Sequence, residues 1–524
     1  MIRKPEMSPN RRIFLNIVAT YGRSLYSLVV GLFCGRWALQ ALGEVDYGLL
    51  GLVGGLVGFV AFINSLLSMG VMRFYAVCQG AAKTANSHAA GLEECRKWFN
   101  TAITLHSAVP IVLVAIGYPL GAWAIEQVLT IPADRVSHCI WIWRFTCISC
   151  FVGMASVPFS AMYEAKQEIA ELTIYGFTVT TLNAMVLYYM INHPDVWIVK
   201  YAFAQCLFAV VPSLLILALA FRNYQECRFN AKYLWSPYRM KQIMVFSASR
   251  FFGAFANLTA VQGRSILVNK FMGPVFNASM GIGNVVASHA TTLSSSISGA
   301  FWPAIANKSG EGDVKVVTQY MFRTCRLGTL MIAVFAVPLL LEAKEVLRLW
   351  LKNPPPETAE ITMAILLAML LQRMSEGYWM AIMGIGRRVV HYSIIVGSAE
   401  FVGLGVCAAM FFAGCRMRSV EVGLIVASVL ISLLRACQGR AILGISIRHW
   451  LCRVVLPVFG LVMAGIVVGL PSCVFLRPSF LRICMTTACC EMAMVLLGWF
   501  LVLDDGERKI VKDKIAIIKA KLVS

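Results

Sequence analysis

Four arginines inside long apolar segments are the residues of this chain best suited to chemistry. Arg23 and Arg36 lie 13 residues apart in the first apolar segment. Arg250 and Arg264 lie 14 residues apart in a later one. A guanidinium inside a membrane span costs about 2.5–3.5 kcal/mol, so such a residue usually has a function. Its planar fork of donors matches phosphate oxygens, and the four arginines therefore predict a cationic site for a phosphate-bearing substrate.

The outer arginine of each pair has a second interpretation. Arg36 and Arg264 lie near the far ends of their segments, about 20 Å beyond Arg23 and Arg250 at 1.5 Å per residue. Long cationic side chains at such positions can extend to the membrane surface while their stems stay in apolar surroundings. Both interpretations of the outer pair remain open from the sequence.

Polar residues on two further segments are candidates for binding sugars. Asn64 and Ser65 lie in the second apolar segment, and His289 and Ser295 lie in the eighth, which is rich in serine and threonine. Hydroxyl and amide groups hydrogen-bond sugars, but small residues that let helices pack closely give the same pattern. His289 also fits a hydrogen-bonded interior histidine. The pattern alone does not separate these alternatives.

Three acidic residues lie well inside apolar segments. Glu376, Glu400 and Glu491 are candidates for binding a coupling proton or sodium ion. Arg373 precedes Glu376 by three residues, a spacing that brings two side chains together on a helix. We expect these two to form an ion pair, which competes with an ion-coupling role for Glu376.

The motifs of soluble enzymes are absent from the sequence. There is no phosphate-binding loop of the Walker type, no HExxH and no nucleophile elbow. The 17 cysteines do not have the spacing of a metal site and mostly fall in apolar segments, as buried hydrophobic residues do. We therefore expect no catalytic residue, no metal site and no cofactor, and interpret the chain as a protein that is not an enzyme.

The composition is that of a polytopic helical membrane protein. Of 524 residues, 59% are hydrophobic and only 14% are charged, about half the usual charged fraction. Apolar runs long enough to span a membrane predict about 14 transmembrane helices. They cover residues 13–40, 48–72, 98–125, 136–162, 172–192, 199–221, 242–269, 278–306, 321–341, 358–385, 389–413, 419–443, 451–472 and 479–503.

The basic residues predict the orientation. With a cytoplasmic N-terminus, 30 Lys and Arg face the cytoplasm, 12 face the outside and four (Arg23, Arg144, Arg250 and Arg373) lie well within spans. Both termini are then cytoplasmic. Lys308, Lys315, Arg323 and Arg326 mark one cytoplasmic loop. The net charge of +20 thus reflects loops between spans rather than binding of nucleic acid.

A repeat divides the chain into two lobes. Shifting the sequence by 230 residues places Leu42–Gly80 on Met272–Gly310 with 7 identities in 39 positions. Six spans per repeat predict two parallel, pseudo-symmetric six-helix lobes followed by two extra helices. The expected divisions are a first lobe (1–221), a basic linker (222–241), a second lobe (242–445), two added helices (446–503) and a basic amphipathic tail (504–524). The linker, with its interleaved aromatic residues, fits an interfacial helix that contacts anionic lipids.

Two motifs resemble a known family. The corner LGEVDYG (42–48) and the later MGPVFNASMGI (272–282) occupy the positions expected in both lobes of the polysaccharide-flippase branch of the multidrug/oligosaccharidyl-lipid/polysaccharide exporter superfamily. The segments 23–55, 160–177 and 268–313 extend the resemblance, which covers residues 1–445. It implies a MATE-like, V-shaped pair of lobes in the bacterial inner membrane.

The resemblance also implies a function. Similar proteins flip an undecaprenyl-pyrophosphate-linked oligosaccharide for surface polysaccharides such as the O-antigen of lipopolysaccharide, and work beside polymerase and assembly proteins. Cavity arginines on their first and seventh spans are thought to meet the pyrophosphate, and Arg23 and Arg250 stand at comparable places.

Two other classes of protein compete with this interpretation. An ion-coupled multidrug antiporter of the same fold is the main alternative, although spans one and two contain no carboxylate for it. A membrane glycosyltransferase would need acidic residues in a large outer loop, and the expected outer loops are short.

Overall fold

The computed structural model describes residues 9–56, 58, 62–65, 67–68, 70–72, 74–75, 78, 88–166, 168–193, 198–248, 251–310, 313–386, 388–503 and 508. These residues are almost entirely helical, and they contain no strand. Arg250, Arg387 and the amphipathic tail after residue 503, apart from Arg508, lie outside them.

The chain forms two compact units, residues 1–281 and 282–524. The first contains α1 (Pro9–Leu56), α3 (His88–Trp123), α4 (Val136–Ala165), α5 (Ile169–Asn192), α6 (Ile198–Asn223), α7 (Pro237–Ala248) and α8 (Phe251–Met272). The second contains α10 (Val314–Leu351), α11 (Thr358–Arg373), α12 (Glu376–Ile385), α13 (Val389–Phe412), α14 (Arg418–Leu443), α15 (Ile447–Trp450), α16 (Leu456–Phe475) and α17 (Phe480–Leu501). The division falls inside α9 (Pro274–Gly310), and the lobe boundaries inferred from the repeat stay a prediction.

Ten helices among the described residues are long and apolar enough to cross a membrane, or eleven if the bent pair α11–α12 is one span. Their positions agree with the apolar runs of the sequence. α8 and α9, with 22 and 37 residues, are not among these helices. Both are long enough, and both carry polar side chains along their length. The total of 14 spans stays a prediction.

The repeat has a structural counterpart at its two corner glycines. Gly43 has a φ of 75° inside α1, and Gly273 has a φ of 89° between α8 and α9. A Cβ at either position would meet no atom within 4 Å, so glycine is needed there for its backbone conformation rather than for space. The corners predicted by the sequence are thus equivalent in geometry. In the first repeat, the non-helical Gly43 divides Pro9–Leu56 into two helical segments, as the two apolar runs predicted.

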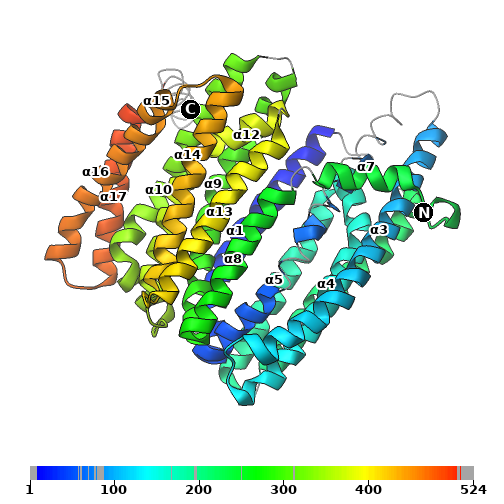
Figure 1. Ribbon diagram of the computed structural model, residues 1–524, viewed down its shortest axis with the longest axis horizontal. Coiled ribbons are helices and arrows are strands. Elements are labelled where there is room, and N and C mark those ends of the chain that lie inside the picture. The colour runs from blue at the N-terminus through cyan, green and yellow to red at the C-terminus, as the bar shows by residue number, and fades with distance from the viewer. Residues whose placement is uncertain are drawn as a thin grey trace, which may run out of the picture. The chain divides into compact units, whose positions relative to one another are not determined.

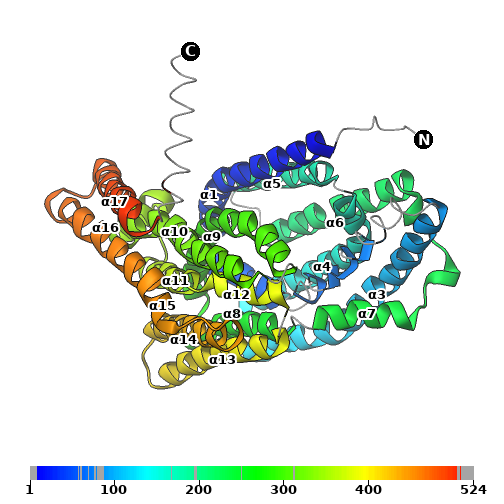
Figure 2. The same cartoon turned by 90° about the horizontal axis from the view of Figure 1, so that it is seen from above.

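Within the first unit, α1 packs beside α5, α4 beside α6 and α3 beside α4 (Figures 1 and 2). Tyr26 of α1 lies against α5, where its hydroxyl is 2.7 Å from Thr181 Oγ1 and its ring centroid is 5.2 Å from that of Phe177. Ser27 and Thr180 approach to 3.5 Å one position further along. These contacts set the rotation of α1 about its axis relative to α5, and therefore which side chains of α1 point away from α5.

Within the second unit, α16 and α17 form a hairpin that packs on α10 (Figures 1 and 2). α10 is interrupted at the non-helical Glu342, directly after the predicted end of the span at residue 341, and a second helical segment continues to Leu351. The predicted cytoplasmic loop after α9 is also shorter than expected. Lys315, Arg323 and Arg326 lie on α10 itself rather than in a loop, because the helix begins at Val314.

The basic linker is docked on the start of α3. The sequence favoured one interfacial helix over residues 222–241, but the structure has two short 3₁₀ turns before α7 begins at Pro237. Asn100 of α3 contacts both Arg228 and Asn230 of the linker at 2.8–3.1 Å. Tyr233 donates a hydrogen bond of 2.8 Å to Glu93, and this bond raises the pKa of the tyrosine. Side chains of α3 thus form hydrogen bonds with backbone groups of the linker that would have been paired internally in a continuous helix.

Candidate substrate-binding helices

Arg23 is an exposed cation on α1. Its side chain lies across the backbone of α5 at Gly176, where an added Cβ would come within 2.7 Å of Arg23 Cδ. The glycine therefore makes room for the stem of the arginine. Arg23 has no hydrogen-bond or ion-pair partner among the residues that the structure describes. An exposed guanidinium without an internal carboxylate is available to an external anion.

The outer arginines differ from each other. Arg36 is partly buried on α1 and, within the described part of the chain, has no polar partner. Arg264 of α8 is only 5% exposed and contacts other groups of the protein. Arg264 is therefore part of the packed interior of its unit, whereas Arg36 is accessible. Arg250, the predicted counterpart of Arg23, lies outside the described residues.

The hydroxyl-rich α9 presents two different faces. Asn284, Ser288, Thr292 and Ser295 are all exposed, and their spacing of four, four and three places them on one side of the helix. Ser294, in contrast, is fully buried and donates a 3.0 Å hydrogen bond to the Gly328 carbonyl of α10. Ser294 thus serves helix packing, whereas Ser295 lies on an exposed face of the helix, and sugar binding by this face stays a prediction.

The remaining polar candidates are partly buried or exposed. Asn64 is partly buried, and its Oδ1 has no hydrogen-bond partner among the described residues. Ser65 is exposed and donates to the Phe62 carbonyl at 2.8 Å. His289 is half-buried, and its Nε2 has no partner in the part of the chain that the structure describes. Asn64 and His289 therefore each retain an unused polar atom.

Arg373 and Glu376 form the predicted ion pair. The pair lies where α11 and α12 meet at a bend of 44°, and both side chains are largely buried. Ser298 of α9 donates a further hydrogen bond of 3.3 Å to Glu376 Oε1. The carboxylate that was a candidate for ion coupling is therefore engaged by a cation and a hydroxyl of its own unit.

Side chains of neighbouring helices donate hydrogen bonds to the backbone carbonyls at this bend. Trp450 donates to the Met374 carbonyl at 2.8 Å, Ser432 to the Leu371 carbonyl at 2.7 Å, and Arg435 to the Gln372 carbonyl at 3.3 Å. A broken helix in a membrane needs such partners for its freed carbonyls. Because protein donors occupy these three oxygens, they do not form an open cation site.

The other two acidic candidates occupy different environments. Glu400 of α13 is 5% exposed and contacts other groups of the protein. Glu491 of α17 is only partly buried. No group of three or more His, Cys, Asp or Glu that could hold a metal ion occurs among the described residues.

A buried carboxylate that sequence reasoning missed lies at the kink of α10. Glu342 is 2% exposed and accepts hydrogen bonds from Arg482 at 2.6 Å, Thr486 at 2.9 Å and Cys473 at 3.2 Å. These donors come from the α16–α17 hairpin, so the cluster fastens the two added helices to α10. The signal in the sequence was weak, because the apolar run that predicted this helix ends one residue earlier.

Arg144 was predicted to lie within a span but was not among the candidate site residues. It lies on an exposed face of α4, with Nε 3.1 Å from Tyr118 Oη and its guanidinium 4.7 Å from the centre of the Trp141 ring. Aromatic groups on either side hold this arginine. It thus differs from Arg23, which has no such partner.

Searches of known proteins by sequence and by structure gave different results. No protein-family profile and no curated protein sequence matches the chain. Solved structures do match. A lipid II flippase MurJ in an inward closed conformation superposes with a TM-score of 0.65 at 12% identity, covering 93% of this chain and 98% of its own.

Multidrug transporters of the MATE family also match. An inward-facing MATE transporter of the MOP superfamily has a TM-score of 0.60 at 14% identity, covering 80% of this chain and 94% of its own. A MATE transporter in a bent conformation has a TM-score of 0.57 at 14% identity, covering 83% and 95%. At these identities the likeness shows the fold alone. The predicted fold class, an all-helical membrane protein of MATE-like architecture, is confirmed.

Proposed function

We propose that the chain is a flippase that moves a lipid-linked oligosaccharide bearing a pyrophosphate across a membrane by alternating access. The lipid of the proposed substrate is undecaprenol, and the membrane is the bacterial inner membrane. Arg23 and Arg250 would engage the phosphates. Glycans delivered in this way would supply a surface polysaccharide such as the O-antigen of lipopolysaccharide, with a polymerase or other assembly protein as partner.

The observation that carries the proposal is that Arg23 has no polar partner among the described residues. A charge inside a membrane span is costly unless a counter-charge or water accompanies it. The sequence places no Asp or Glu between positions 47 and 92, and none before Glu44 in the first apolar segment. A cation kept in a span without a carboxylate is suited to a substrate that brings its own negative charge.

The exposed face of α9 supports a polar substrate. Asn284, Ser288, Thr292 and Ser295 form a row of donors and acceptors that can hydrogen-bond sugar hydroxyls. The hydroxyls of Ser288 and Ser295 each donate to a backbone carbonyl one turn earlier, which leaves their oxygen lone pairs available as acceptors. Such a face suits an uncharged glycan better than a cationic drug.

The alternative is an ion-coupled multidrug antiporter. The TM-score of 0.60 with an inward-facing MATE transporter favours it. Arg23 and Arg36 argue against it, because exposed cations repel the cationic compounds that a carboxylate site would hold. Glu376, Glu400 and Glu491 remain candidates for ion coupling in either function.

A complementation experiment tests the proposal. The chain is expressed in a bacterium that lacks its own O-unit flippase, and surface glycan is scored together with the amount of protein in the membrane. We expect the wild-type chain to restore display and Arg23→Ala to lower it at least tenfold at equal protein.

Arg144→Ala is the matched control, because Arg144 is also an exposed arginine within a span but has local aromatic partners. We expect it to retain display. Full display of surface glycan by the Arg23→Ala variant would show that Arg23 is not part of the proposed substrate site. Wild-type protein that reaches the membrane, restores no display and lowers the accumulation of a cationic dye would instead establish the antiporter function.

A further inference from the structure

His106 of α3 is fully buried and has no hydrogen-bond partner. The residue is 0% exposed, and neither Nδ1 nor Nε2 is paired with any of the described residues. Buried polar groups are normally hydrogen-bonded, so an exception in a folded protein needs an explanation. An ionisable side chain inside a membrane span is also costly and usually has a function. The presence of His106 is therefore not explained by an interaction that the protein makes in this conformation.

The face of α3 that carries His106 is otherwise apolar. Phe99, Ala102 and Val109 contribute to a hydrophobic core of the first unit, together with residues of α4 such as Phe159. Along α3, these three residues and His106 follow one another at intervals of three, four and three, which is the spacing of one side of a helix. A leucine at position 106 would continue this core. Packing alone therefore does not account for a histidine.

Two prolines interrupt the backbone hydrogen bonds at the level of His106. Pro110 lies inside α3 and Pro158 inside α4, and the two helices pack side by side (Figures 1 and 2). Because proline has no N–H, the carbonyl four residues earlier loses its helical donor, and these carbonyls belong to His106 and Met154. The backbone of Met154 is the polar group of α4 next to the imidazole, although it does not have hydrogen-bond geometry. A carbonyl without its helical donor thus lies beside an unpaired ring.

This arrangement suits a ring that changes its protonation state. A neutral imidazole has one N–H donor and one acceptor nitrogen, whereas a protonated imidazole has two donors. Helices bend at prolines, because the ladder of backbone hydrogen bonds is interrupted there. Bending of α3 at Pro110 or of α4 at Pro158 would bring the Met154 carbonyl into hydrogen-bond range and admit water. Both changes would stabilise the protonated ring.

Few other titratable groups approach this position. On α3 and α4, only the thiols of Cys147 and Cys150 lie within two helical turns of His106 or Met154. The other elements that pack on α3 or share its core carry the following titratable residues: Tyr47 and Arg73 on either side of the second apolar segment, Glu126 at the far end of α3, Glu171 and Tyr175 on α5, Cys206 and Arg222 on α6, Glu226, Cys227, Lys232 and Tyr233 in the linker, and Tyr238, Arg239 and Lys241 on α7. Among the described residues, the imidazole is thus the group suited to take up a proton at the level of the two prolines.

We propose that His106 binds the proton that drives transport, and that bending of α3 and α4 at Pro110 and Pro158 opens the ring to water. The proton would pass from water on one side of the membrane to the free ring nitrogen, and from there to water on the other side. The inference rests on the proposed transport function and names its coupling ion. An imidazole nitrogen takes up a proton near neutral pH, whereas hard metal cations such as sodium prefer oxygen ligands.

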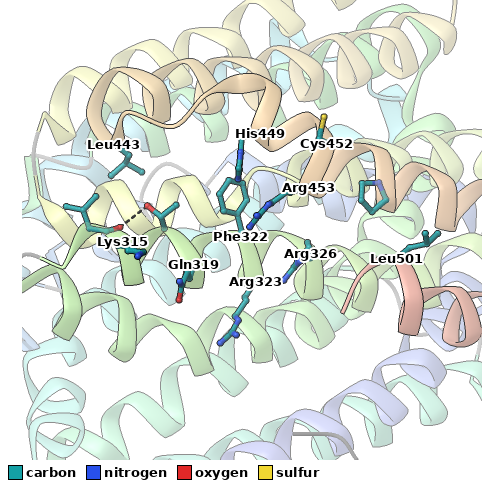
Figure 3. Close-up of a pocket in the computed structure, with 13 residues that line it drawn as sticks. Lys315, Gln319, Phe322, Arg323, Arg326, Leu443, His449, Cys452, Arg453 and Leu501 are labelled. Carbon is teal, nitrogen blue, oxygen red and sulfur yellow. Dashed lines mark hydrogen bonds between the residues drawn. The ribbon is translucent and has the colours of Figure 1, made fainter. Parts of the chain in front are cut away.

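Deuterium exchange at the C2 position of each imidazole tests whether water reaches His106, and it needs no substrate. The full chain in liposomes is incubated in deuterated buffers from about pH 5 to about pH 9, the range in which histidine titrates. Mass spectrometry measures the deuterium at each histidine. His449 is the reference, because it is exposed and lines a cavity of about 930 Å³ in the second unit, with its ring centroid 5.6 Å from that of Phe322 (Figure 3).

We expect His106 to exchange more slowly than His449, at a rate that follows a sigmoid in pH because the reaction passes through the protonated ring. Complete protection of His106 under conditions in which His449 exchanges would overturn the proposal, since a ring that water never reaches cannot carry a proton.

Coupling is measured as the rate at which a lipid-linked oligosaccharide is flipped in liposomes with a proton gradient of either sign, divided by the rate at equal pH. We expect a ratio of about ten for the wild type, within the usual range of coupling between two sites, and of about one for His106→Gln and His106→Leu. Glutamine keeps hydrogen-bonding groups and leucine fits the apolar face, but neither binds a proton. His449→Gln is the matched control and should keep the wild-type ratio. Thermal unfolding checks that each variant is folded.

The two experiments separate this inference from the proposed function. A wild-type rate that does not respond to the gradient, or a His106→Gln variant that keeps the full ratio, would overturn the role of His106. Wild-type protein that flips no substrate, while His106 exchanges with a sigmoidal pH profile, would contradict the flippase function alone, because proton binding at His106 has then been observed.

Discussion

The two arginines of α1 differ from the paired charges of the second unit at the α10 kink and the α11–α12 bend. Arg23 and Arg36 have no polar partner among the described residues. In the second unit, Glu342 is paired with Arg482, and Glu376 with Arg373. An ion pair between two residues of the protein holds helices together, while a cation without a protein partner can bind an anionic substrate. The contrast separates charges that stabilise the fold from charges that are available for function, and the predictions below test it on one scale, the free energy of unfolding.

The largest loss of stability should follow Glu342→Ala. It removes the partner of Arg482 and the acceptor of two further hydrogen bonds, from Thr486 and Cys473, at a site with almost no solvent, and breaking a buried pair costs about 3–5 kcal/mol. Thermal unfolding in detergent measures the change. Lys344 lies two residues after Glu342 and forms an exposed ion pair with Glu360. Lys344→Ala should therefore cost less than about 1 kcal/mol. Equal effects of the two variants would contradict the assigned role of Glu342.

A smaller loss should follow Glu376→Ala. It leaves Arg373 without its carboxylate at the α11–α12 bend and removes the acceptor of Ser298, at a cost of about 1–3 kcal/mol. Arg373→Ala/Glu376→Ala should recover part of that loss, since no unpaired charge remains. If the double variant loses more free energy of unfolding than the two single variants together, Arg373 and Glu376 do not form a stabilising pair at the bend.

The corner glycines should give an effect of about 1–2 kcal/mol each. Alanine at Gly43 or Gly273 must adopt a positive φ, which is unfavourable for any residue with a Cβ. Gly51→Ala is the matched control: it is helical, a Cβ there meets nothing within 4 Å, and alanine should stabilise the helix slightly. Unfolding temperatures that fall equally in all three variants would argue against the conformational role.

The smallest change of stability should follow Arg23→Ala. The side chain is exposed and makes no polar contact with described residues, so unfolding should shift by less than about 0.5 kcal/mol. Function, in contrast, should fall at least tenfold, as set out above. A large destabilisation would place Arg23 among the structural charges and remove the contrast with Glu342 and Glu376.

Much of the fold could be predicted because its signals are local. Apolar runs located the helices, and the glycine of each repeat located the two corners with positive φ. The bend at Met374–Ser375 could not be predicted, since it lacks proline or glycine and depends on donors from α14 and α15 that are distant in sequence. The kink at Glu342 likewise depends on Arg482, 140 residues away.

The candidate site was predictable in kind but not in detail. Residue type indicated that the four arginines of the two repeats form one cationic site. Arg23 is exposed, but Arg264 is buried within its unit. Ser294 and Ser295 are neighbours in the sequence, but only the first meets the Gly328 carbonyl. Which polar residue faces a neighbouring helix is decided by packing, and a single sequence does not contain that information.

The most direct test of the proposed function is a flipping assay with purified protein in liposomes. A fluorescent oligosaccharide linked to undecaprenyl pyrophosphate is placed in both leaflets, and a membrane-impermeant reagent that destroys the fluorophore is added outside. Because translocation exposes the inner pool, the flippase account predicts that nearly all fluorescence is lost with wild-type protein and about half with Arg23→Ala or with empty liposomes. Loss of only half with folded wild-type protein, with and without a sodium or proton gradient, would contradict it.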